Sequence, residues 1–153
     1  MRSRGARCHR TTPSLDTPCA FCDIAAGRIS ADLVVYRTER VVGFVAREPD
    51  AFGHTVLAPT VHCADLFDAP VEVACDLTHA VQSLAQHYRE TIGMDGFNLL
   101  HASGRAAQQS VPHLHVHLIP RFDGDGLEGW PPLGTPDQTA QDMASQLQMP
   151  PSV

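Results

Sequence analysis

The sequence lacks any apolar run of the roughly 18 to 20 residues that a membrane-spanning helix needs. It also lacks a basic surplus, because 11 Lys and Arg stand against 17 Asp and Glu and the formal net charge is −6. A general binder of nucleic acid or of an anionic membrane needs a basic surface that neutralises phosphates. We therefore expect a soluble protein without a nucleic-acid or membrane partner, and a single nucleotide remains an allowed ligand.

A disulfide framework is also missing. The five cysteines are odd in number and widely spread, at Cys8, Cys19, Cys22, Cys63 and Cys75. This pattern excludes a densely cross-linked secreted scaffold and favours the reducing cytoplasm. Residues 1–17 contain four arginines but no apolar segment of the kind that a secretory signal requires. We predict a disordered extension or a mis-called start there, with a transit peptide as the alternative.

One globular domain is what 153 residues with 43% hydrophobic and 18% charged side chains can form. We place its ordered body at residues 18–122. Residues 123–153 are rich in glycine and proline at first and are predicted to form a tail, with a possible short helix within 136–148.

The order of the elements predicts an α+β fold. A short turn or helix follows residue 18, and β-rich runs follow at residues 33–36, 41–45 and 55–58. Apolar residues then recur at steps of three and four, which predicts a helix over 70–92 that ends at Gly93. Two more strands are expected, at 97–100 and 111–119. We predict a meander of about five antiparallel strands covered by one long helix.

Three histidines at alternate positions distinguish the last of these strands. Successive side chains of a strand point to opposite faces, so His113, His115 and His117 share one face, and apolar residues occupy the other. A lone histidine on a strand is usually an ordinary residue. Three in a row between Pro112 and Pro120 favour a functional cluster.

The spacing His-φ-His-φ-His-φ-φ, where φ is apolar, resembles the histidine triad (HIT) family. Residues 104–111, with a glycine followed by Gln-Ser-Val, resemble the segment that precedes the family's triad, and residues 53–59 resemble its GHTLVIP strand. The resemblance extends from about residue 19 to residue 121. It implies a HIT-like α+β fold, with about five antiparallel strands, one long helix and a short N-terminal helix, and it implies a homodimer.

The resemblance also implies roles for individual residues. The middle histidine, His115, is the implied nucleophile that forms a covalent nucleotidyl intermediate, and His117 and His54 support it. Gln109 and Ser110 are implied phosphate contacts. The apolar walls of the nucleotide pocket are implied to be Phe21, Ile24 and Phe44.

A pair of cysteines three positions apart suggests a metal site. Cys19 and Cys22 can share one tetrahedral zinc ion, although two nearby cysteines in an intracellular protein are often merely buried. The zinc-containing branch of the HIT family completes such a pair with histidines that match His62 and His113. The resemblance thus implies a structural zinc, and Cys63 and Cys75 are expected to be buried thiols.

Two departures from the family pattern concern the substrate. Ala46 replaces an acidic or amide residue that contacts ribose hydroxyls, and Ala102 replaces an asparagine near the phosphate. We expect a hydrolase or nucleotidyl transferase acting on a nucleoside phosphoramidate or a dinucleoside polyphosphate. The alternatives are a nucleotide-binding protein with altered substrate or weak activity, and a catalytic metal centre on the triad. Three consecutive same-face strand residues rarely converge on one ion, which disfavours the last.

Overall fold

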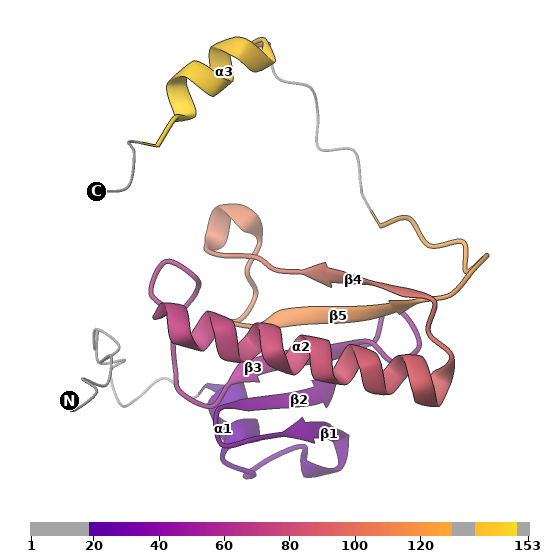
Figure 1. The fold of residues 1–153 in the computed structure, drawn as a ribbon. Coiled ribbons are helices and arrows are strands. Elements are labelled where there is room, and N and C mark those ends of the chain that lie inside the picture. The colour runs from indigo at the N-terminus through magenta and orange to yellow at the C-terminus, as the bar shows by residue number, and fades with distance from the viewer. Residues whose placement is uncertain (1–18, 130–136, 150–153) are drawn as a thin grey trace, which may run out of the picture.

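The computed structural model describes residues 19–129 and 137–149, so the extension predicted at residues 1–17 lies outside the described residues. Figure 1 shows one sheet with a long helix across it. The helices are α1 (Ala20–Ala25), α2 (Val71–Ile92) and α3 (Ala140–Leu147), and short 3-10 turns lie at Ala31–Leu33 and Arg105–Ala107. The strands are β1 (Val34–Arg37), β2 (Val41–Val45), β3 (Thr55–Pro59), β4 (Gly96–Leu100) and β5 (Val116–Arg121).

The five strands are antiparallel and lie in the order β1-β2-β3-β5-β4. The predicted α+β class with five antiparallel strands is confirmed, but the simple meander is wrong. After β3, helix α2 leads the chain to the edge of the sheet, where β4 lies. The next strand, β5, then returns to pair between β4 and β3. This return brings the triad segment into the middle of the sheet, where it lies beside the strand that follows His54.

Helix α2 covers one face of the sheet, as its apolar periodicity predicts. Its buried side chains pack with residues of the sheet in one continuous cluster, and those from the helix are Leu77, Ala80, Val81, Leu84, Ala85 and Tyr88. The helix ends at Gly93, whose φ of 66° is a left-handed conformation that glycine adopts without steric cost. Cys75, which we expected to be buried, is exposed on the solvent side of α2.

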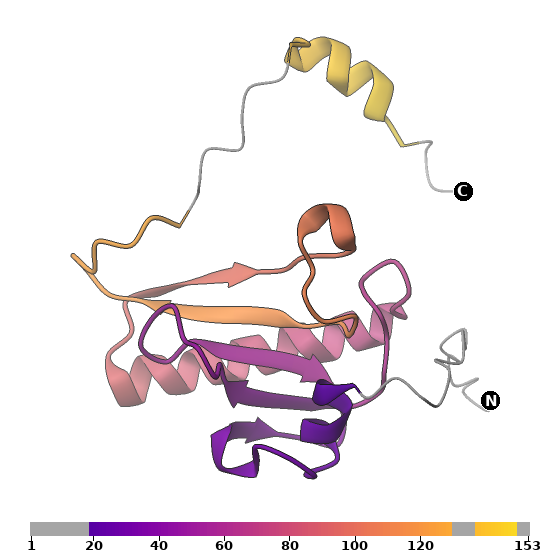
Figure 2. The same ribbon diagram turned by 180° about the vertical axis from the view of Figure 1, so that it is seen from behind.

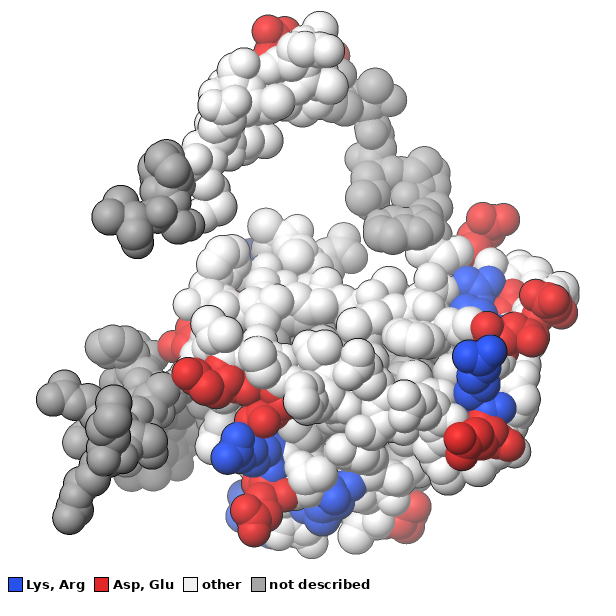
Figure 3. All heavy atoms as spheres, in the orientation of Figure 1, with Lys and Arg blue, Asp and Glu red and all other residues white. Residues whose placement is uncertain are grey.

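The opposite face of the sheet carries α1, as the reverse view in Figure 2 shows, and a smaller apolar cluster packs there. Strand alternation separates the two clusters: Val41 and Leu57 join the α2 side, and their neighbours Val42 and Val56 join the α1 side. On the α2 side, the described part of the surface carries charged side chains mainly near its two ends, and the area over α2 is largely uncharged (Figure 3).

The triad strand begins later than predicted. Strand β5 runs from Val116 to Arg121, so His113 and His115 lie in the extended segment before it. There the Leu114 N–H donates to the Cys63 carbonyl at 2.7 Å, and no ladder bond to β3 forms at this point. The predicted alternation nevertheless holds, because Leu114 and Leu118 are buried in the α2-side cluster. None of the described helices is both long enough and apolar enough to cross a membrane.

Candidate active site and metal centre

Two cysteines and two histidines from three segments meet beside α1. Cys19 and Cys22 come from the start of α1, His62 from the loop after β3, and His113 from the triad segment. One ligand atom from each of these four residues lies within 4.8 Å of all the others. Cys19 Sγ is 3.3 Å from His113 Nδ1, and Cys22 Sγ is 3.5 Å from the Nδ1 atoms of both His62 and His113.

These distances fit a tetrahedral zinc ion. Zn–S bonds of about 2.3 Å and Zn–N bonds of about 2.0 to 2.1 Å place the sulfur and nitrogen ligands of a tetrahedron roughly 3.6 Å apart. His113 Nε2 lies 2.9 Å from the Pro59 carbonyl, which can only accept, so the proton is on Nε2 and Nδ1 faces the metal position. Burial, and then the hydrogen bond with Cys19, raises the pKa of the Cys22 thiol to about 11, so zinc must displace its proton.

The middle histidine of the triad has one nitrogen fixed and the other available. His115 Nδ1 lies 2.6 Å from the carbonyl oxygen of His113, and a carbonyl only accepts, so Nδ1 carries the proton. In the neutral ring, Nε2 then holds a lone pair. The side chain is 5% exposed and its ring lies 5.1 Å from that of His117. This arrangement suits a nucleophile.

His117 receives the opposite tautomer from a short chain of hydrogen bonds. The backbone N–H of Asp50 donates to His54 Nδ1 at 3.1 Å, which leaves the proton of His54 on Nε2. That Nε2 donates to His117 Nδ1 at 2.9 Å. The proton of a neutral His117 is therefore on Nε2, where the ring offers a donor.

Burial keeps the cluster neutral. It lowers the pKa of His117 to about 4, with the rings of His115 and His54 adding to the shift. Burial also lowers the pKa of His113 to about 4 and lowers the pKa values of His115 and His54. At neutral pH the cluster therefore combines a lone pair on His115 with a proton on His117.

Aromatic side chains form the wall next to the triad. The ring of Phe21 stands edge-on to Phe44 at 5.3 Å and to His115 at 5.1 Å between centroids. Ile24 and Phe44 are buried in the α1-side cluster, against which Ala46 also packs. The three residues expected to line an apolar pocket therefore lie together, with Phe21 in contact with the His115 ring, and Ala46 packs against the same cluster.

Gln109 has a different immediate role from the expected one. Its amide nitrogen donates to the carbonyls of Ala64 at 2.7 Å and Val111 at 3.0 Å, and its oxygen accepts the Gly104 N–H at 2.8 Å. The side chain holds the loop before the triad in shape. A phosphate contact by this amide requires one of these bonds to be exchanged and stays a prediction, as does the contact expected from Ser110, which is exposed on the same loop.

Sequence reasoning did not include His101 among the site residues. Its ring lies next to the triad, with Nδ1 2.7 Å from the carbonyl oxygen of His115. The available signal was a fourth histidine shortly upstream of the triad, at the end of a predicted strand. A single histidine at the end of a strand belongs to no repeating pattern, so the sequence does not distinguish it from an ordinary polar loop residue.

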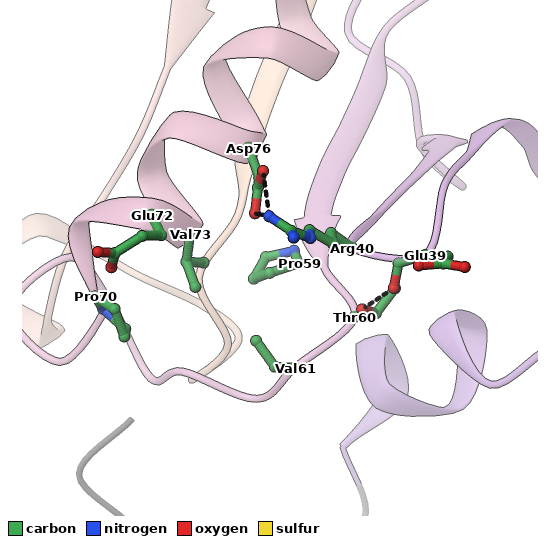
Figure 4. A pocket seen from close by; sticks show the side chains of 9 residues that line it. All are labelled: Glu39, Arg40, Pro59, Thr60, Val61, Pro70, Glu72, Val73 and Asp76. Carbon is green, nitrogen blue, oxygen red and sulfur yellow. Dashed lines mark hydrogen bonds and ion pairs between the residues drawn. The ribbon is translucent and has the colours of Figure 1, made fainter. Parts of the chain in front are cut away.

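A surface cavity of about 440 Å³ lies away from the triad. Figure 4 shows it between the start of α2, the start of β2 and the end of β3, where Arg40 pairs with Asp76 at 3.3 Å and Val61 lies to one side. No triad histidine lines it. The cavity and the histidine cluster are therefore separate features.

Proteins of known sequence and structure are similar to this chain. An adenosine 5'-monophosphoramidase of Saccharomyces cerevisiae is 32% identical over 120 residues, which are 77% of this chain and 73% of that protein. An adenylylsulfatase of Arabidopsis thaliana is 32% identical over 114 residues, covering 74% of this chain and 57% of that protein. The crystal structure of a zinc-bound histidine triad family protein from Mycobacterium smegmatis is 36% identical, with a TM-score of 0.68 over 72% of this chain and 79% of that one.

The zinc-bound neighbour and the four converging ligands agree. The chain has a structural zinc site of the Cys2His2 type, formed by Cys19, Cys22, His62 and His113, as predicted. The family model described as the HIT domain matches residues 28–124, which include all three triad histidines. The chain belongs to the histidine triad family.

Proposed function

We propose that this protein is a nucleotide hydrolase or nucleotidyl transferase that works through a covalent nucleotidyl intermediate on His115. One observation carries the proposal. The hydrogen bonds give His115 a free lone pair on Nε2 and give His117 a proton on Nε2, and the two rings lie 5.1 Å apart. A nucleophile and a hydrogen-bond donor are therefore adjacent, as attack on phosphorus and stabilisation of the leaving atom require.

The reaction has two balanced steps. His115 Nε2 attacks phosphorus, and a P–N bond forms as the bond to the leaving group breaks. The leaving group takes that electron pair and a proton from solvent, the Nε2–H of His117 donates a hydrogen bond to the leaving atom, and the nucleotidylated ring of His115 becomes cationic. Water or another acceptor then attacks phosphorus and the P–N bond breaks. Nε2 of His115 recovers its electron pair, and the proton of the attacking group passes to solvent.

The names of two relatives guide the choice of substrate. A monophosphoramidase and an adenylylsulfatase are both named for adenylyl compounds. We therefore infer a nucleoside phosphoramidate or a dinucleoside polyphosphate as the substrate class. Ala46 and Ala102 favour an altered base or sugar preference, and a nucleotide-binding protein with weak turnover is the second candidate.

A catalytic metal centre on the triad finds little support in the geometry. Both nitrogens of His113 are engaged, Nδ1 at the zinc site and Nε2 with Pro59. Nδ1 of His115 donates to a carbonyl, and Nδ1 of His117 accepts from His54. The three rings thus make different interactions, and the zinc site that includes His113 is structural.

Rapid acid quenching with a substrate labelled in its nucleotide phosphate tests the mechanism. We expect wild-type protein to yield an acid-labile phosphoramidate on the peptide that contains His115. His115→Gly should bind AMP and lose turnover by several orders of magnitude, as removal of a nucleophile does. The exposed α2 histidine substitution His79→Asn is the control and should retain activity. Near-normal turnover of His115→Gly, or label on another residue, rejects the assignment.

We further propose that two copies of the chain form a homodimer through β4 and the neighbouring part of α2. β4 is an edge strand, so its outer backbone groups are available for pairing. Exposed apolar side chains line it, at Phe97, Leu99 and Leu100, and the adjoining face over α2 is largely uncharged. An edge of this kind suits an isologous contact with a second copy.

Substitution on the two opposite edge strands tests the dimer. Leu99 on β4 is 47% exposed and Val35 on β1 is 45% exposed, which makes them a matched pair. Sedimentation at micromolar concentration should give a dimer for wild type and Val35→Arg, and a monomer for Leu99→Arg. A monomeric wild-type protein, or dissociation by Val35→Arg alone, contradicts the proposal.

A further inference from the structure

The peptide of the proposed nucleophile lies beyond the regular hydrogen bonding of the sheet. The ladder between β4 and β5 ends at the pair Leu100–His117, and the ladder between β3 and β5 ends at Leu57–Val116. His115 precedes both ends. Its backbone therefore needs other partners if the ring is to keep one direction.

The side chain of His101 supplies the missing partner. Where the chain leaves β4, the ring turns back and Nδ1 lies 2.7 Å from the carbonyl oxygen of His115. A carbonyl only accepts, so Nδ1 carries the proton and donates. The imidazole thus adds one hydrogen bond to the triad segment beyond the point where the β4 backbone stops pairing with β5.

The other nitrogen of His101 connects to a second loop. His101 Nε2 lies 2.7 Å from Ser103 Oγ, and because a neutral His101 with its proton on Nδ1 has a lone pair there, the serine hydroxyl donates. Ser103 Oγ in turn accepts the backbone N–H of Leu66 at 3.1 Å. One chain of three hydrogen bonds thus joins the loop before α2, the end of β4 and the triad segment.

We propose that His101 is a positioning residue that fixes the direction of the His115 ring through the peptide of His115, with Ser103 holding His101 in its tautomer. The ring of His115 donates to the carbonyl of the preceding triad histidine, and its own carbonyl accepts from His101, so the residue is held on both sides. The catalytic consequence rests on the proposed function. A displacement of about 1 Å in a reacting group can cost about 100-fold in rate.

Three variants separate the two bonds. His101→Leu removes both, Ser103→Ala removes only the bond from serine, and His101→Asn keeps a donor near the position of Nδ1 while losing Nε2. With a nucleoside phosphoramidate as the substrate, we expect His101→Leu to lower kcat by about 10- to 100-fold at nearly constant KM. His101→Asn and Ser103→Ala should each lower kcat less than His101→Leu. A merely structural residue would instead give no rescue by asparagine and no separation of kcat from KM.

A spectroscopic measurement makes the inference independent of turnover. Long-range proton–nitrogen NMR on zinc-loaded protein with labelled histidine reports which ring nitrogen of His115 is protonated and how well its environment is defined. We expect a single Nδ1-protonated form in wild type and His101→Asn, and a shifted or broadened His115 signal in His101→Leu. An unchanged His115 signal in a folded His101→Leu protein overturns the positioning role. If wild type turns over no phosphoramidate or dinucleotide, the proposed function fails, and these spectra still decide the role of His101.

Discussion

Replacing one zinc ligand tests how strongly the metal site supports the rest of the domain. In Cys22→Ser a weak oxygen ligand replaces a thiolate whose Sγ lies 3.5 Å from both histidine ligands. Zinc should then dissociate during purification without added metal. Because Cys19 and Cys22 flank the first turn of α1, loss of zinc releases this helix from the loop after β3 and from the triad segment.

The size of the effect follows from the energy of such sites. The binding free energy of structural zinc in small zinc domains is about 10 to 16 kcal/mol, whereas the free energy of unfolding of a whole domain is only about 5 to 15 kcal/mol. The core between the sheet and α2 contains none of the four zinc ligands, so we expect the chain to fold without zinc. If only about 3 kcal/mol of the binding energy supports the fold, Tm falls by roughly 10 °C for a domain of this size. AMP should also bind more weakly, because α1 carries Phe21, whose ring lies 5.1 Å from that of His115.

Elemental analysis, thermal unfolding and AMP titration measure these three consequences on one preparation. The control is Cys75→Ser, because Cys75 is exposed on α2 and is not part of the metal site. It should keep about one zinc per chain and the wild-type Tm. If Cys22→Ser retains one zinc per chain, or loses zinc with Tm and AMP affinity unchanged, the link between the metal, α1 and the nucleotide pocket is refuted.

Two further predictions concern single positions. Ala46→Asp should strengthen AMP binding by about 1 to 3 kcal/mol, because a charged carboxylate next to the α1-side cluster can accept hydrogen bonds from the ribose hydroxyls. The control is titration with 2',3'-dideoxy-AMP, which lacks these hydroxyls. Equal strengthening for both nucleotides contradicts this explanation. Gln108→Gly should raise the free energy of unfolding by about 1 kcal/mol, because Gln108 has a φ of 62°, a left-handed conformation that disfavours side chains with a Cβ. Denaturant unfolding beside Ala107→Gly, a helical neighbour that should lose stability, checks the sign.

The features that follow a period could be predicted from sequence. The apolar spacing in α2, the alternation around the triad and the paired cysteines each reflect a local geometric rule, and their positions agree with the structure. The histidine ligands His62 and His113 came from the family resemblance. They lie far from the cysteines in sequence, and no local pattern would have selected them.

The features that depend on long-range contacts could not be predicted. β5 lies between β3 and β4 because of the point at which α2 returns the chain to the sheet. The apolar residues of β4 and β5 are equally compatible with either strand lying beside β3. The start of β5 was misplaced because residues before Val116 alternate like a strand but bond to a loop. Gln109 and His101 are similar cases, since their partners are backbone groups, and backbone groups leave no trace in the residue types of a sequence.

The separation of the two apolar clusters by the sheet has a consequence for engineering and for evolution. Helix α2 and the ring of His115 lie on opposite faces of the sheet, so a substitution among the buried residues of α2 does not contact that ring. Mutations there can accumulate, compensate one another and change thermal tolerance with little effect on reactivity. The α1 side has less freedom, because the metal ligands, the apolar cluster beside α1 and the ring of His115 lie together there. We therefore expect thermostable variants to arise first in α2, and variants with new substrates to arise around α1.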